Sequence, residues 1–116
     1  MTGPISLQAA FPTYAPCNAS GVGTVRFQNP KATSQYKVTS VAVGPTSPAS
    51  TGCTCQLMRL GFQLVASTPF AGIGDTAGGD PVYLNPGEYI DANITGAPAN
   101  SNVPVVFYYE ETLFGQ

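Results

Sequence analysis

The chain lacks the residue types on which most enzymes depend. Its 116 residues include no histidine and no tryptophan, and only four cationic and six acidic side chains. Without histidine, the usual base that activates a serine or threonine nucleophile is missing, so a catalytic triad is excluded. The only adjacent carboxylates, Glu110 and Glu111, would point to opposite faces of a strand and would not share a proton. We therefore expect no catalytic residue and no enzymatic activity.

Charge is scarce as well. The formal net charge is −2 and only 9% of residues are charged, too few for the cationic stripe that neutralises nucleic-acid phosphates. The longest strongly apolar stretch, residues 103–109, is far shorter than the ~20 residues of a membrane-spanning helix. Residues 1–5 have neither the positive nor the continuous apolar region of a secretory signal, so we expect assembly in a cytoplasm. The composition predicts neither a nucleic-acid partner nor a membrane partner.

Glycine and proline, by contrast, are abundant, with 13 and 11 residues. They leave one uninterrupted gap of more than ten residues, 31–43, and that gap is rich in Val and Thr, which favour strands. The expected strands number about seven and cover residues 22–28, 36–43, 53–60, 62–67, 82–84, 88–95 and 103–111. Strands at this spacing predict an all-β chain, a single antiparallel β-sandwich of the jelly-roll or immunoglobulin-like kind.

Local patterns add detail to this expectation. In residues 36–43 the apolar positions switch from even to odd, which indicates a β-bulge or a strand buried on both faces. Residues 85–88, Asn-Pro-Gly-Glu, fit a type II turn, and the Gly-rich residues 70–81 are expected to form a long loop. The predicted core consists of alternating residues of the last strand, backed by apolar residues of other strands: Val105, Phe107 and Tyr109, with Phe27, Val38, Leu57 and Ile94.

The first 20 residues follow neither a helical nor a strand period. Three prolines interrupt their scattered apolar residues, so we expect residues 1–20 to be an extended N-terminal arm and residues 21–116 to be the sandwich domain. The apolar residues of the arm would dock on the parent domain or on a neighbour, and a disordered arm is the alternative. They are the candidate interface residues, namely Ile5, Leu7, Phe11 and Tyr14.

Two sets of residues are candidates for a chemical site. Asp75 and Asp80 flank glycines in a segment that could wrap calcium. The segment lacks the regular alternating carboxylates and terminal Glu of a helix-loop-helix calcium site, and Asp and Gly are common in ordinary turns, so we expect no metal and no cofactor. Cys17, Cys53 and Cys55 are too few for a zinc site, and Cys53 and Cys55 on one strand face would strain a mutual disulfide. We expect buried or half-buried free thiols, with a bridge from Cys17 to either of the others as the alternative outside a reducing cell.

The strand and turn motifs over residues 21–111 resemble those of short β-sandwich virion proteins of tailed bacteriophages, especially of actinobacterial hosts. The motifs that carry the resemblance are Gly21-x-Gly23-x-Val25-x-Phe27-x-x-Pro30, Tyr36-x-Val38-x-x-Val41-x-Val43, Cys53-x-Cys55-x-Leu57-x-Arg59-x-Gly61, Asp75-Thr76, Leu84-x-Pro86-Gly87-Glu88 and Gly96 near the final strand.

The resemblance implies a non-enzymatic virion structural protein, either a capsid decoration or minor capsid protein or a minor tail protein. Its arm and strand edges would bind the major capsid protein or other virion subunits. The sparsely charged surface favours a homo-oligomer over a neutral domain that binds no other subunit. A carbohydrate- or receptor-binding sandwich module on the particle surface is the alternative. In that case some of the six tyrosines would stack on sugars, although tyrosines spread over several strands more often serve in cores and interfaces.

Overall fold

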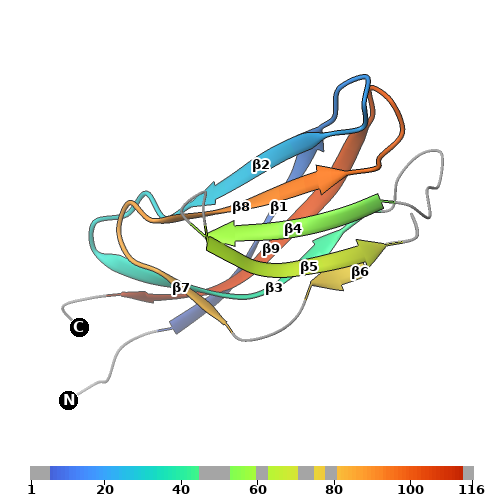
Figure 1. Cartoon of the computed structure of the whole chain (residues 1–116). Coiled ribbons are helices and arrows are strands. Elements are labelled where there is room, and N and C mark those ends of the chain that lie inside the picture. The colour runs from blue at the N-terminus through green and yellow to red at the C-terminus, as the bar shows by residue number, and fades with distance from the viewer. Residues whose placement is uncertain (1–5, 45–52, 60–62, 71–74, 78–80, 114–116) are drawn as a thin grey trace, which may run out of the picture.

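A computed structural model describes residues 6–44, 53–59, 63–70, 75–77 and 81–113 of the chain. These residues form nine strands and contain no helix long and apolar enough to cross a membrane (Figure 1). The strands are β1 (Ser6–Pro16), β2 (Gly23–Gln28), β3 (Ser34–Val43), β4 (Cys53–Arg59), β5 (Gln63–Phe70), β6 (Asp75–Ala77), β7 (Val82–Leu84), β8 (Tyr89–Thr95) and β9 (Asn102–Leu113).

The strands form two antiparallel sheets that face each other (Figure 1). Sheet A has the order β1-β9-β3-β6, with β7 also pairing with β3, and sheet B has the order β2-β8-β4-β5. The pairs are nested along the chain, because β1 pairs with β9, β2 with β8, β3 with β6 and β7, and β4 with β5. Successive pairs fall in alternate sheets, which is the order of a jelly roll. The predicted antiparallel β-sandwich is confirmed, and the strand order selects the jelly-roll form.

The core lies between the two sheets and follows the two-residue period of the strands. On β9, Val103, Val105 and Phe107 are fully buried because each points toward sheet B. Four more predicted core residues, Phe27, Val38, Leu57 and Ile94, are also buried. Tyr109 is partly buried and packs against this core. The predicted core is therefore present, with Tyr109 at its margin.

Two local predictions are confirmed by backbone geometry. The register between β3 and β9 shifts between Val38 and Ser40, so a bulge explains the switch from even to odd buried positions. In the turn before β8, Glu88 N donates to Asn85 O at 2.9 Å, and Gly87 has a φ of 84°. A positive φ at this position is the reason that the turn requires glycine.

Residues 6–16 differ most from the expectation, because they form a full strand of the sandwich. Every residue of β1 has a partner on β9, from Ser6 opposite Thr112 to Pro16 opposite Asn102. The segment is extended as predicted, but it belongs to the domain rather than preceding it at residue 20. The strand docks on the parent domain through its pairing with β9, and the Phe11 ring contacts Phe27, whereas Leu7 and Tyr14 remain exposed.

Hydrogen bonding explains why β1 tolerates its prolines. Just past the strand, Cys17 N donates to Ser101 O at 2.8 Å, so the odd-numbered residues of β1 direct their backbone groups toward β9. The even-numbered residues, which include Pro12 and Pro16, direct theirs to the open edge of sheet A. A proline nitrogen at an open edge interrupts no hydrogen bond of the sheet.

The expectation of a long loop over residues 70–81 is wrong in part. Phe70 ends β5, and Asp75–Ala77 form β6, which pairs antiparallel with the end of β3 from Val41 to Val43. The glycines of this segment, at positions 72, 74, 78 and 79, flank β6 on both sides and leave these three residues free to pair. Only contact with a strand distant in sequence makes so short a segment regular.

Candidate interaction surface

On strands β2, β4 and β8, whose side chains the structure describes, the outer face of sheet B is mostly polar and several of its side chains bind one another. Across β2 and β8, Thr24 Oγ1 donates to Asn93 Oδ1 at 2.9 Å. Across β4 and β8, the hydroxyls of Thr54 and Thr95 are 2.6 Å apart. Cross-strand pairs of this kind satisfy polar groups within the sheet. This face therefore resembles the solvated side of an ordinary antiparallel sandwich.

An ion pair occupies the centre of the same face. Arg26 Nε donates to Asp91 Oδ1 at 2.8 Å and a second guanidinium nitrogen reaches Asp91 Oδ2 at 3.1 Å, which makes the pair bidentate. The hydrogen bond to Asp91 is the main cause of a raised Arg26 pKa. The guanidinium carbon also lies 3.6 Å from the centre of the Tyr89 ring, which it covers. Tyr89 is thus not available to stack on a ligand through that side of its ring.

The outer face of sheet A has the opposite character. Alternation along the strands brings seven uncharged, mostly apolar residues to this face, which we call the apolar face: Ala10, Pro12 and Tyr14 of β1, Pro104, Val106 and Tyr108 of β9, and Ala42 of β3. The strand register makes them neighbours, because Tyr108 lies opposite Ala10, and Val106 lies between Pro12 and Ala42. Tyr14 is 63% exposed and Tyr108 is 42% exposed. A group of exposed apolar side chains on one rigid sheet is typical of a surface that contacts another protein.

Among the described residues, charged side chains border the apolar face where β3, β7 and β9 meet. Lys37 of β3 lies opposite Glu110 of β9, with 3.9 Å between Nζ and Oε2, and Tyr83 of β7 lies on the far side of Lys37. Tyr83 is also exposed. The border therefore carries one charge of each sign and no net charge.

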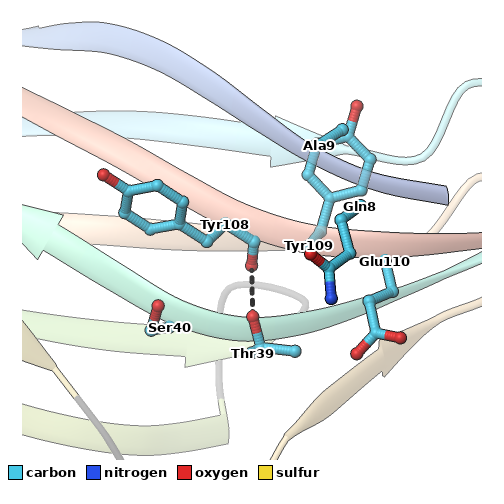
Figure 2. Close-up of a pocket in the computed structure, with 7 residues that line it drawn as sticks. All are labelled: Gln8, Ala9, Thr39, Ser40, Tyr108, Tyr109 and Glu110. Atoms are coloured by element: carbon cyan, nitrogen blue, oxygen red, sulfur yellow. Dashed lines mark hydrogen bonds between the residues drawn. The ribbon is translucent and has the colours of Figure 1, made fainter.

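A shallow pocket lies at this border (Figure 2). It has a volume of ≈ 270 Å³ and is lined by Gln8, Ala9, Thr39, Ser40, Tyr108, Tyr109 and Glu110. The bulge of β3 positions Thr39 so that its hydroxyl donates to Tyr108 O at 3.2 Å (Figure 2). The lining side chains supply hydroxyl, amide and carboxylate groups that can contact a ligand.

All four cations of the chain lie in ion pairs. The pairs are Arg26–Asp91, Lys31–Glu111, Lys37–Glu110 and Arg59–Glu88. Glu111 is buried, and its hydrogen bond with Lys31, at 2.9 Å, is the main cause of a lowered Glu111 pKa. With every cation already paired, the surface has no concentrated positive charge to attract an anionic partner.

The predicted interface residues do not share one surface. Ile5 lies outside the described residues. Leu7 and Phe11 are on the inner side of β1, where the Phe11 ring centre lies 5.4 Å from that of Phe27. Only Tyr14 belongs to the apolar face. The interface role of all four residues stays a prediction.

Sequence reasoning missed the β9 residues of the apolar face. We used Val103, Val105 and Phe107 to orient the strand, and of the residues between them we considered only Tyr108, as one of six tyrosines that could stack on sugars. Those residues are Pro104, Val106 and Tyr108, which are not charged either. A strand with apolar residues on both faces signals that both faces are covered by protein, and that signal was present in the sequence.

Cys17, Cys53 and Cys55 are free and buried, as expected. Burial is the main cause of their raised pKa values, which reach about 11 for Cys53 and about 12 for Cys55. Thiols with such pKa values are almost entirely protonated at neutral pH and are poor nucleophiles and metal ligands. Asp75 lies in β6 and Asp80 lies outside the described residues, so the calcium alternative stays a hypothesis.

Comparison with known proteins gives remote structural likeness only. No family model matches the chain, and no curated protein matches its sequence. A chain from the acidic stable capsid of Helicobacter pylori bacteriophage KHP30 has a TM-score of 0.48 and 9% identity, with 94% of each chain covered. A chain from Bacillus endospore appendages, which form disulfide-linked pili, has a TM-score of 0.46 and 11% identity, with 98% of this chain and 93% of that chain covered. A Podospora anserina GH26-CBM35 mannanase has a TM-score of 0.42 and 13% identity, with 98% of this chain and 28% of that chain covered. Structural neighbours thus include a phage capsid protein and a spore pilus, and they are too remote to identify a family or a function.

Proposed function

We propose that this chain is a non-enzymatic structural subunit of a bacteriophage virion. Within the virion it acts as a capsid decoration or minor capsid protein that binds the major capsid protein or other virion subunits. The proposal combines the sequence resemblance with one observation, the contrast between the two outer faces of the sandwich. Polar side chains on the outer side of sheet B bind each other, whereas sheet A carries the uncharged apolar face with its exposed tyrosines, and the Lys37–Glu110 pair lies at the border of that face.

The apolar face has the properties of a protein interface. Interfaces are enriched in tyrosine and depleted of charged residues at their centre, and both features occur here. Its residues lie on paired strands, so the surface is preformed and little conformational entropy is lost when it binds. A broad, preformed sheet face suits the flat surface of a neighbouring subunit better than it suits a small ligand.

Substitution of Tyr108 by lysine tests this proposal. Tyr108→Lys places a positive charge on the apolar face, and Gln56→Lys adds the same charge to an exposed position on sheet B. We expect Tyr108→Lys to lower the copy number of the protein in purified particles at least tenfold, as for an interface hot spot worth about 2 kcal/mol. Gln56→Lys should leave the copy number within about twofold of the wild type.

Copy number is measured by mass spectrometry relative to the major capsid protein, after both variants are shown to fold. Equal incorporation of both variants would overturn the role of the apolar face. Absence of the wild-type protein from purified particles would overturn the virion assignment itself. Hundreds of copies per particle indicate decoration of the capsid, and a few copies indicate a tail protein.

A carbohydrate- or receptor-binding module is the second candidate, and one observation favours it. Tyr14, Tyr83 and Tyr108 are exposed and all lie on the outer side of sheet A. Exposed aromatic rings on one face are suited to stack on sugar rings. A host-surface polysaccharide that binds the wild type but not Tyr108→Ala, while particles incorporate both equally, would favour this candidate over the first.

A further inference from the structure

The first half of β1 is an open edge of sheet A. Residues 6–12 are all exposed, including Leu7 at 51% and Phe11 at 42%. Where the two termini lie, the start of β1 and the end of β9 project beyond sheet B (Figure 1). Leu7 points to the inner side of sheet A, and its 51% exposure shows that the opposite sheet does not cover it. Two large apolar side chains are left exposed next to an unpaired strand edge.

The backbone groups at this edge favour pairing over residues 6–12 only. The even-numbered residues of β1 direct their backbone toward the open edge, so Ser6, Gln8 and Ala10 present free N–H groups. Pro12 and Pro16 have no N–H to offer, although their carbonyl groups can still accept. The first half of the edge is therefore a template for another strand, and the second half is blocked.

The side chains of this edge carry no charge. Natural proteins protect exposed strand edges with charged residues and prolines, and β1 has prolines only in its second half. The segment Ser6–Pro16 contains no Lys, Arg, Asp or Glu at all. Two copies of this strand would meet without repulsion between like charges.

We propose that this edge pairs with the same edge of a second copy of the chain. The two β1 strands run antiparallel about a two-fold axis at Ala9, so that Gln8 exchanges both hydrogen bonds with the partner's Ala10. Ser6 N–H donates to the carbonyl of the partner's Pro12, a bond for which proline is competent. Leu7 then lies directly opposite the partner's Phe11, and each pair covers two side chains that are exposed in the single chain.

This register has two consequences for the side chains of the paired β1 strands. Ala9 pairs with the partner's Ala9 at the axis, where a small side chain allows close approach. Because an antiparallel pairing of identical strands keeps equivalent faces on one side, the two apolar faces join into one surface of double width. Particle binding by that joined surface rests on the proposed function, whereas the dimer itself does not.

A cysteine at position 9 tests the pairing in purified protein. In the proposed register the Cα atoms of the two residues are about 4.5 Å apart, within the range that a disulfide bridges. Ala9→Cys should therefore form a covalent dimer under mild oxidation with oxidised glutathione. Thr13→Cys is the matched control, since it lies on the same side of the same strand but is displaced from its equivalent by about 26 Å. The native thiols are buried and protonated and do not interfere.

We expect at least ten times more covalent dimer from Ala9→Cys than from Thr13→Cys on a non-reducing gel. Equal amounts from both variants, or none from either, would overturn the proposed register.

As a second measurement, Gln8→Pro removes an outward N–H and leaves the bonds to β9 intact. Gln8→Pro should weaken dimerisation in sedimentation equilibrium at least tenfold while the melting temperature changes little. Unchanged self-association, or a wild type that stays monomeric at millimolar concentration, would also overturn the proposal. None of these measurements needs a particle, so their failure is distinct from failure of the proposed function.

Discussion

Replacement of Phe27 by alanine should destabilise the sandwich more than replacement of any residue at its margin. Phe27 is only 4% exposed and projects from β2 of sheet B toward sheet A. Its ring centre lies 5.4 Å from that of Phe11, 5.6 Å from Tyr36, 5.1 Å from Phe107 and 4.9 Å from Tyr109. These rings come from three strands of sheet A, so one side chain connects β2 to most of the opposite layer.

The expected cost follows from the cavity that the substitution would leave. Phe→Ala substitutions in protein cores cost about 3–5 kcal/mol, and the cost is higher where the surroundings cannot collapse into the cavity. Here the surrounding rings are attached to hydrogen-bonded strands and stack on one another, as Tyr36 and Tyr109 do with ring centres 4.6 Å apart. We therefore expect Phe27→Ala to lower the free energy of unfolding by about 4–5 kcal/mol, or the melting temperature by about 15–20 °C.

The assay is urea unfolding followed by tyrosine fluorescence and far-UV circular dichroism, because the chain has six tyrosines and no tryptophan. Phe11→Ala is the matched control, since the Phe11 ring packs against Phe27 but is 42% exposed, and the substitution should cost less than about 2 kcal/mol. A loss below about 2 kcal/mol for Phe27→Ala, or equal losses for the two variants, would refute the reasoning from burial.

Three further predictions concern the cysteines, a buried carboxylate and β1. Cys53 and Cys55 should resist iodoacetamide at pH 7.5 in the native protein and react in urea, because burial raises their pKa values to about 11 and about 12; rapid native labelling, detected by mass spectrometry, would contradict this. The lowered pKa of Glu111 contributes stability that is fully present above the ordinary pKa of 4.5 and is lost as pH falls through the pKa of the folded state. Unfolding curves of Glu111→Gln should therefore show a weaker loss of stability below pH 4.5 than those of the wild type. Identical acid profiles would show that the bond between Glu111 and Lys31 adds no stability. Deletion of residues 1–16 should lower the melting temperature clearly, because β9 loses its partner along the whole of β1, whereas unchanged melting would show a separable arm.

The sequence alone was enough for the local features of this fold. Frequent glycine and proline exclude long helices, and a period of two in residues 103–111 specifies a strand whose odd positions are buried. The bulge at Thr39 and the turn at Gly87 are also local, because each depends on the spacing of side chains or on the φ of one residue. For the same reason the core residues Phe107 and Phe27 were predictable from the alternation of their own strands.

Only the tertiary structure decided where the edges lie and what each face meets. Residues 6–16 could not be predicted as a strand because Pro12 and Pro16 are incompatible with a central strand. Their nitrogens interrupt no hydrogen bond of the sheet only where β1 forms its edge. Likewise, nothing local shows that Tyr14 and Tyr108 share a surface, since 94 residues separate them and the pairing of β1 with β9 brings them together. Short paired strands could be predicted from the sequence, because alternation and turn chemistry act within a few residues. The order of those strands, and with it the apolar face and the open edge of β1, depends on pairings between distant segments that no local pattern specifies.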